Sequence, residues 1–108
     1  MKVGSPARAR VGGRAWRVDR ARFLASTHER DCWLCRRPVD RDLPGTHPWG
    51  PTADHEVPLM LGGPELVRDG AVLHLAHNRC NAGRSNTLRA KLAAGQRPAR
   101  DFRTSQQW

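Results

Sequence analysis

The 108-residue chain contains no tyrosine, two phenylalanines and only two lysines. No apolar run approaches the roughly 20 residues that a membrane-spanning helix needs, and the N-terminus lacks the apolar stretch of a secretory signal. We therefore expect a soluble, cytoplasmic protein without a membrane partner. Apolar residues are also few, at 38% of the chain. A domain this small buries little surface, so we expect it to need stabilisation beyond its core.

Cysteine is scarce and odd in number, which argues against a disulfide framework because one thiol would be left over. Cys32 and Cys35 form a Cys-x2-Cys pair, and Cys80 stands alone. In a reducing compartment this pattern, with histidines nearby, favours a metal site. A redox-active Cys32/Cys35 pair is the alternative.

Acidic residues number 10 against 19 basic ones, which leaves a formal charge of +9. Most of the basic residues are arginine, whose planar guanidinium pairs with phosphate through two hydrogen bonds. This excess of positive charge favours a phosphate-rich partner such as nucleic acid.

The chain divides into a basic arm, one domain and a polar tail. We expect an amphipathic helix over 16–30, followed by a loop rich in proline and glycine up to residue 51. Strands over 52–61 and 71–76 would form a long-looped hairpin, with Pro58 confined to an edge or an end. A helix then runs to Ala94, capped by Asn78 and ended by Gly95. The three segments are 1–13, 14–95 and 96–108.

Two half-sites, Cys32-x2-Cys35 and His77-x2-Cys80, together offer the four ligands of a tetrahedral zinc site. The hairpin would fold the intervening residues 36–76 back so that the halves meet. Structural zinc contributes about 10–16 kcal/mol in small peptides, which would stabilise a domain with a small core. His28 or His47 could replace His77 as the fourth ligand, but the two-residue spacing from Cys80 favours His77.

A second set of polar residues would meet where the hairpin approaches the helix. Asp54 and His55 lie on the first strand, and Asn81 lies in the first helical turn. Carboxylate and amide oxygens suit Mg2+ or Mn2+, and an imidazole can take a proton from water. Neighbouring residues in a strand point to opposite faces, so Asp54 and His55 would approach a substrate from different directions.

The order of motifs resembles the HNH endonucleases. Cys-x2-Cys is followed by Asp-His-Glu-Val-Pro-Leu at 54–59 and by Leu-Ala-His-Asn-Arg-Cys-Asn-Ala-Gly-Arg-Ser at 75–85. The resemblance covers about 32–92 and implies an α+β fold: a small ββα-metal domain with a structural zinc knuckle, here preceded by a helix. It also implies a nuclease that uses one Mg2+ or Mn2+ and leaves a 5′-phosphate and a 3′-hydroxyl.

Matching residue by residue, the resemblance makes Asp54 a metal ligand and His55 the general base. Asn81 stands where the last His of the motif often stands, and an oxygen ligand there favours Mg2+ or Mn2+. The middle Asn of the motif is Val72 in this chain, so the orientation of His55 must come from backbone or from another side chain. Contacts to DNA phosphates are expected from three arginines of the helix: Arg79, Arg84 and Arg89.

The chain looks most like small stand-alone HNH proteins of actinobacteria and their phages, some of which accompany the packaging terminase. DNA is therefore the expected partner, with terminase subunits a further candidate, and the compartment is a bacterial cell or a phage-infected host. Two other readings remain: a zinc-stapled module that binds DNA or assembles without catalysis, and an oxidoreductase that uses Cys32 and Cys35.

Overall fold

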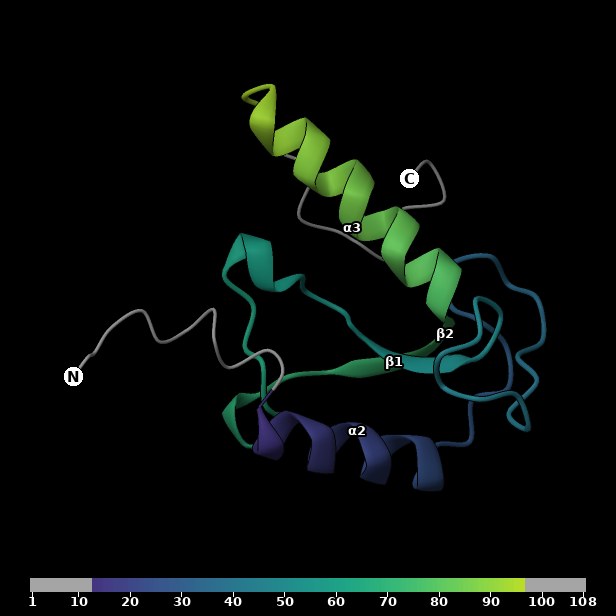
Figure 1. Cartoon of the computed structure of the whole chain (residues 1–108). Coiled ribbons are helices and arrows are strands. Elements are labelled where there is room, and N and C mark those ends of the chain that lie inside the picture. Colours follow the sequence, from purple (N-terminus) through teal and green to yellow (C-terminus); the bar gives the residue numbers. More distant parts are fainter. Residues whose placement is uncertain (1–12, 97–108) are drawn as a thin grey trace.

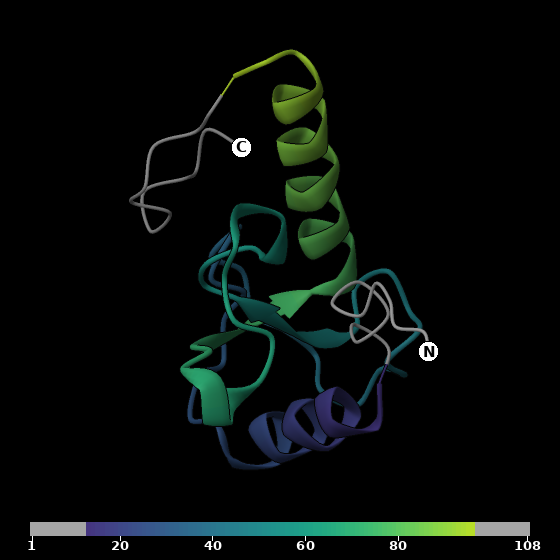
Figure 2. The same ribbon diagram turned by 90° about the vertical axis from the view of Figure 1, so that its left-hand side faces the viewer.

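A two-stranded antiparallel sheet lies between two helices in the computed structural model, which describes residues 13–96 (Figure 1). The strands are β1 (Pro51–His55) and β2 (Leu73–His77), and the helices are α2 (Arg14–Ser26) and α3 (Asn78–Ala93). Figure 2 shows the same order of layers from the side, with α2 below the strands and α3 above them. The predicted α+β class is confirmed for this part of the chain. The predicted arm and tail fall almost wholly outside it.

Strand β1 is shorter than predicted, because it ends at His55 rather than near residue 61. Pro58 has no N–H to donate, and the next residues form a 3-10 turn, η2 (Leu59–Leu61). Gly62 closes that turn at φ 89°, a conformation that favours glycine. A second 3-10 turn, η3 (Val67–Asp69), precedes β2. The link between the strands is thus a structured loop.

The pairing register of the hairpin places Asp54 and His55 of β1 opposite β2. Asp54 lies opposite His74, and His55 lies opposite Leu73. The pairing continues one step further, since Glu56 N donates a hydrogen bond of 2.8 Å to Val72 O.

Helix α2 ends four residues earlier than predicted. Thr27 is extended, at φ −68° and ψ 145°, and its hydroxyl accepts a hydrogen bond from Glu29 N. Glu29 then receives a 2.6 Å hydrogen bond from Leu75 N at its Oε1. This hydrogen bond holds Glu29 against β2, and it outweighs the helical propensity of residues 27–30.

The start of α3 also differs from the prediction, because Asn78 is not its N-cap. His77 occupies the cap position and makes no side-chain capping bond. The Asn78 amide instead donates to Gly45 O at 2.6 Å and to His47 O at 2.9 Å, which ties the proline-rich loop to the helix. At the other end Gly95, at φ 82°, ends the helix as predicted.

The buried apolar cluster is small and includes Cys32, while Cys35 and Cys80 pack against it. Four residues form its centre, and the partly buried Phe23, Leu24 and Trp33 pack against them. Among the described residues, no helix is long and apolar enough to cross a bilayer. The four residues at the centre of the cluster are Cys32, Val39, Leu75 and Ala76.

Candidate functional site

Four side chains from three elements converge beside this core. Cys32 and Cys35 come from the turn after α2, His77 ends β2, and Cys80 lies in the first turn of α3. Their potential ligand atoms all lie within 4.8 Å of one another. The cluster could hold a metal ion, and its histidine is His77, as the spacing predicts.

The backbone around the first pair turns tightly enough to aim both thiols the same way. Arg36 N donates to Cys32 O, and Cys32 N donates to Arg37 O, both at 2.8 Å. Arg36 adopts a left-handed conformation at φ 69°, which closes the turn. The Cys32/Cys35 segment is thereby a preformed loop.

The contacts of His77 leave one ring nitrogen facing the thiols. Its Nε2 lies 3.0 Å from Pro38 O, and because a carbonyl only accepts, Nε2 carries the hydrogen. Nδ1, with its lone pair, lies 3.3 Å from Cys35 Sγ and 3.7 Å from Cys80 Sγ. A histidine ligand held by a backbone carbonyl in this way is typical of metal sites.

The crowding of the sulfurs affects how readily they ionise. Burial, followed by the neighbouring Cys32 and Cys35 thiols, raises the pKa of Cys80 to about 12. Thiols packed this closely do not readily lose their protons unless a cation binds to the sulfurs. A bound metal ion would supply that charge and displace the proton.

A cavity of about 350 Å³ brings the second set of predicted residues together. Asp54 and His55 from β1 and Asn81 from α3 all line it. The lining also includes residues that sequence reasoning did not assign to a site, among them Trp16 and Arg20 of α2. Helix α2, which precedes the turn that carries Cys32 and Cys35, therefore forms part of this cavity.

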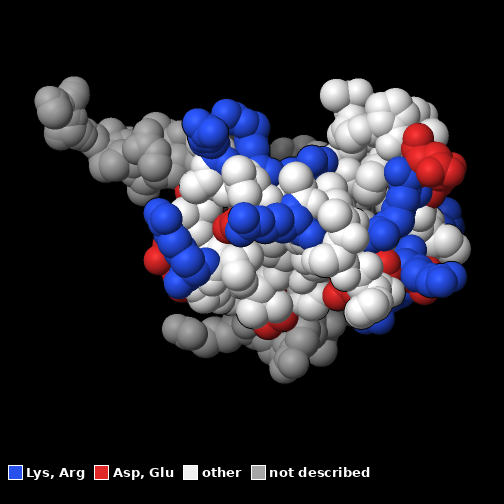
Figure 3. Space-filling model, turned by 90° about the horizontal axis from the view of Figure 1, so that it is seen from below, with Lys and Arg blue, Asp and Glu red and all other residues white. Residues whose placement is uncertain are grey.

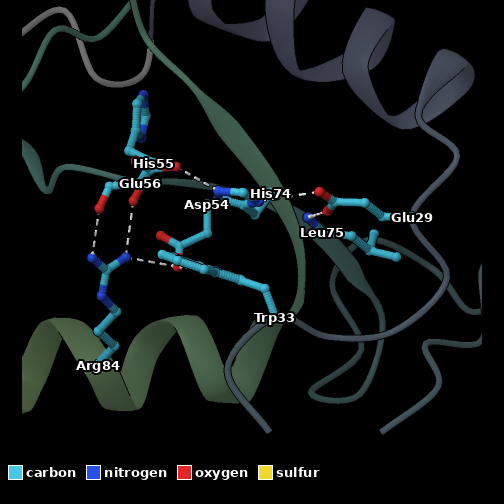
Figure 4. A network of polar contacts seen from close by, with 8 residues as sticks. All are labelled: Glu29, Trp33, Asp54, His55, Glu56, His74, Leu75 and Arg84. Carbon is cyan, nitrogen blue, oxygen red and sulfur yellow. Dashed lines mark hydrogen bonds and ion pairs between the residues drawn. The ribbon is translucent and has the colours of Figure 1, made fainter. Parts of the chain in front are cut away.

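The carboxylate of Asp54 is buried and held by two donors. Trp33 Nε1 and Arg84 Nη1 each donate to its Oδ2 at 2.9 Å (Figure 4). Neither donor occupies Oδ1. Burial raises the pKa of Asp54 above its ordinary value of 3.8, and this outweighs the opposing attraction of Arg84 and the hydrogen bonds.

The imidazole of His55 points away from the Asp54 carboxylate, as the alternation of a strand predicts (Figure 4). Its Nε2 lies 2.8 Å from Glu65 O, so Nε2 carries the hydrogen and the Nδ1 lone pair is the basic site of the neutral ring. Trp16 stacks on the ring at 4.6 Å between centroids. Val72 cannot form a hydrogen bond that orients the His55 ring, so the ring is oriented by the backbone carbonyl of Glu65 instead.

The three predicted phosphate-binding arginines differ in their surroundings. Arg84 is 4% exposed and also donates to His55 O and Glu56 O, so it holds the end of β1. Arg89 is exposed and lines the cavity. Arg79 is exposed as well, and its guanidinium lies 4.9 Å from the ring centroid of Trp49.

Positive charge extends beyond these three side chains. Figure 3 shows Lys and Arg side chains spread over the face that carries α2, with neutral and acidic residues between them. Helix α2 contributes three exposed arginines to this spread, namely Arg14, Arg17 and Arg22.

Sequence reasoning missed the residues that orient the site rather than those that would react. Trp33 stands out in the sequence only as one of the two residues between Cys32 and Cys35, and nothing in the sequence marks Glu65, which acts through its backbone.

Comparison with protein-family descriptions, with curated proteins and with solved structures finds no match to this chain.

Proposed function

We propose that the protein is a metal-dependent DNA endonuclease of the HNH type, with a ββα-metal core stabilised by zinc. The observation that carries this proposal is the shared cavity of Asp54, His55 and Asn81. These residue types supply a carboxylate, a base and an amide oxygen beside a hairpin followed by a helix. That is the arrangement the sequence motifs predict.

The role of the Cys/His cluster in this proposal is structural. Three sulfurs and one nitrogen are ligands that zinc prefers in closed four-coordinate sites. The cluster joins the turn after α2 to the junction of β2 and α3. Zinc would therefore fix the base of the hairpin relative to the helix that carries Asn81.

His55 serves as the general base. Its hydrogen bond to Glu65 O fixes the tautomer, and the stack with Trp16 limits the rotation of the ring. Nδ1 takes the proton from a water molecule as its oxygen attacks phosphorus. This step needs the neutral imidazole.

Asp54 and Asn81 would hold a catalytic Mg2+ or Mn2+. Their donor chemistry fits, since Oδ1 of Asp54 is not occupied by Trp33 or Arg84 and the amide oxygen of Asn81 is also a hard ligand. When bound, such an ion stabilises charge on the phosphate and on the departing oxygen. The protein contributes a buried carboxylate that is already fixed in direction.

Arginines on and around the cavity would hold the DNA backbone. Arg89 at the cavity and the exposed arginines of α2 are suited to phosphate contacts, which position DNA but carry no sequence information. We therefore propose binding with little sequence preference.

A plasmid nicking assay tests the proposal. Zinc-loaded protein should convert supercoiled plasmid to nicked or linear forms when Mg2+ or Mn2+ is added, and not without them. Asn81→Ala should need more metal to reach the same rate. Absence of cleavage across the metal series would contradict the proposal.

The ion pair between Arg84 and Asp54 favours a second candidate, a zinc-stapled DNA-binding module without catalysis. In this view Arg84 permanently occupies the carboxylate that a catalytic ion would need. The same assay separates the two candidates, because the non-catalytic module would retard plasmid in a gel and leave it uncut.

A further inference from the structure

The turn that supplies Cys32 and Cys35 also sends a side chain to the proposed catalytic carboxylate. Trp33 lies between the two cysteines, and its indole N–H donates to Asp54 Oδ2 at 2.9 Å. We propose that Trp33 is a positioning residue that aims Asp54 at the catalytic metal ion and so couples the Cys/His cluster to the active site. This inference rests on the proposed function.

The position of Trp33 is fixed through its backbone by the cluster and by β2. Its N–H donates to Leu75 O at 2.9 Å, and the preceding residue is the fully buried Cys32. Trp33 is therefore held on one side by a metal-ligand residue and on the other by the strand that pairs with Asp54.

The indole ring itself is held by two charged or polar groups. It stacks on His74 with centroids 4.3 Å apart and planes at 20°, and the guanidinium carbon of Arg84 lies 4.9 Å from its centre. His74 is in turn fixed at both nitrogens, by Glu29 Oε2 at 3.1 Å and by Glu56 Oε1 at 2.9 Å (Figure 4). Such a ring has little freedom to turn.

The two donors on Oδ2 determine how the carboxylate faces the cavity. Trp33 and Arg84 approach the same oxygen, so they fix the plane of the carboxylate and leave Oδ1 as the oxygen available to a cation. Hydrogen bonds to a metal-binding carboxylate typically change metal affinity about 10–100-fold when removed. Arg84 also holds the backbone of β1, whereas the indole N–H contacts the carboxylate alone.

The test compares Trp33→Phe with Trp49→Phe in zinc-loaded protein. Phenylalanine keeps an aromatic ring beside His74 but removes the N–H. Trp49 is a matched control because its ring meets His77 of the cluster edge-on at 5.1 Å and lines no part of the cavity around Asp54. Binding of Mn2+ is measured directly by electron paramagnetic resonance, and zinc content and melting temperature are recorded in parallel.

We expect Trp33→Phe to weaken Mn2+ binding about tenfold or more, while Trp49→Phe leaves it unchanged. Equal Mn2+ affinity in Trp33→Phe and wild-type protein would overturn the role of Trp33 and leave the proposed function standing. A wild-type protein that binds no Mn2+ beside its zinc would overturn the proposed function as well.

A measurement on the wild-type protein covers the case in which Trp33→Phe does not fold. Saturation with Mg2+ should shift the indole Nε1–H resonance of Trp33 in a nitrogen–proton NMR spectrum and leave that of Trp49 in place. A stationary Trp33 resonance, in a spectrum where other signals respond to Mg2+, would contradict the coupling.

Discussion

The Cys/His cluster and the cavity beside it differ in where their positive charge comes from. The three cysteines of the cluster have no cationic side chain among their ligand partners, and the neutral Cys80 thiol is favoured until a metal ion arrives. In the cavity, Asp54 already has Arg84 as its counter-ion. An ion entering the cluster displaces thiol protons and gains three sulfurs and one nitrogen, ligands that zinc prefers, whereas one entering the cavity must share the Asp54 carboxylate with Arg84. We therefore expect tight zinc binding and weak, exchangeable Mg2+ binding.

The largest effect is expected from the cluster. Cys80→Ser removes one of four ligands, and because structural zinc contributes on the order of 10 kcal/mol, the variant should lose both zinc and its folded structure. Zinc content and far-ultraviolet circular dichroism measure this. Ala82→Ser, which places a serine at an exposed position in the same helical turn, should behave as wild type. A folded Cys80→Ser protein that retains zinc would contradict the structural role of the cluster.

A smaller loss of stability is expected from the ion pair of the cavity. Arg84→Met leaves Asp54 buried without its counter-ion, which should lower the free energy of unfolding by about 3–5 kcal/mol at neutral pH. Asp54→Asn combined with Arg84→Met should recover part of that loss. Urea unfolding of zinc-loaded protein measures both variants. Wild-type stability in Arg84→Met, together with weaker DNA binding, would show that Arg84 contacts phosphate instead.

The same variant has a defined pH dependence. Burial already raises the pKa of Asp54, and without Arg84 the main opposing attraction is lost, so the pKa rises further. A raised carboxyl pKa favours the folded state at low pH and destabilises it as the pH rises. The stability deficit of Arg84→Met relative to wild type should therefore shrink as the pH is lowered.

The smallest effect is expected at the rim of the cavity. DNA binding should weaken steeply with salt, and Arg89→Ala should reduce the slope of log K against log salt by about 1, as for one lost phosphate contact. Arg41→Ala, an exposed arginine away from the cavity, should leave the slope unchanged. A salt-independent affinity would contradict binding through phosphates.

The parts of the molecule that follow short-range rules could be predicted from the sequence. The two-residue spacings located all four members of the Cys/His cluster, and Gly95 located the end of α3. The hairpin was predicted in outline, although β1 ends at His55, before Pro58 is reached.

The parts that depend on contacts between distant segments could not be predicted. Helix α2 ends early because the Glu29 carboxylate accepts a hydrogen bond from Leu75 N of β2. Asn78 does not cap α3, because its side-chain amide donates to Gly45 O in the loop. Likewise, His55 is oriented by Glu65 O and Asp54 by Trp33, partners that no spacing rule connects. These contacts turn a set of candidate residues into a site with defined geometry.

The most direct test of the central claim is plasmid cleavage by His55→Ala, with His28→Ala as a control at an exposed histidine. Both variants should fold and carry the zinc content of wild type. Loss of a general base lowers the rate about 100-fold or more, so His55→Ala should leave plasmid supercoiled while His28→Ala nicks it normally. Cleavage at the wild-type rate by zinc-loaded His55→Ala would contradict the account.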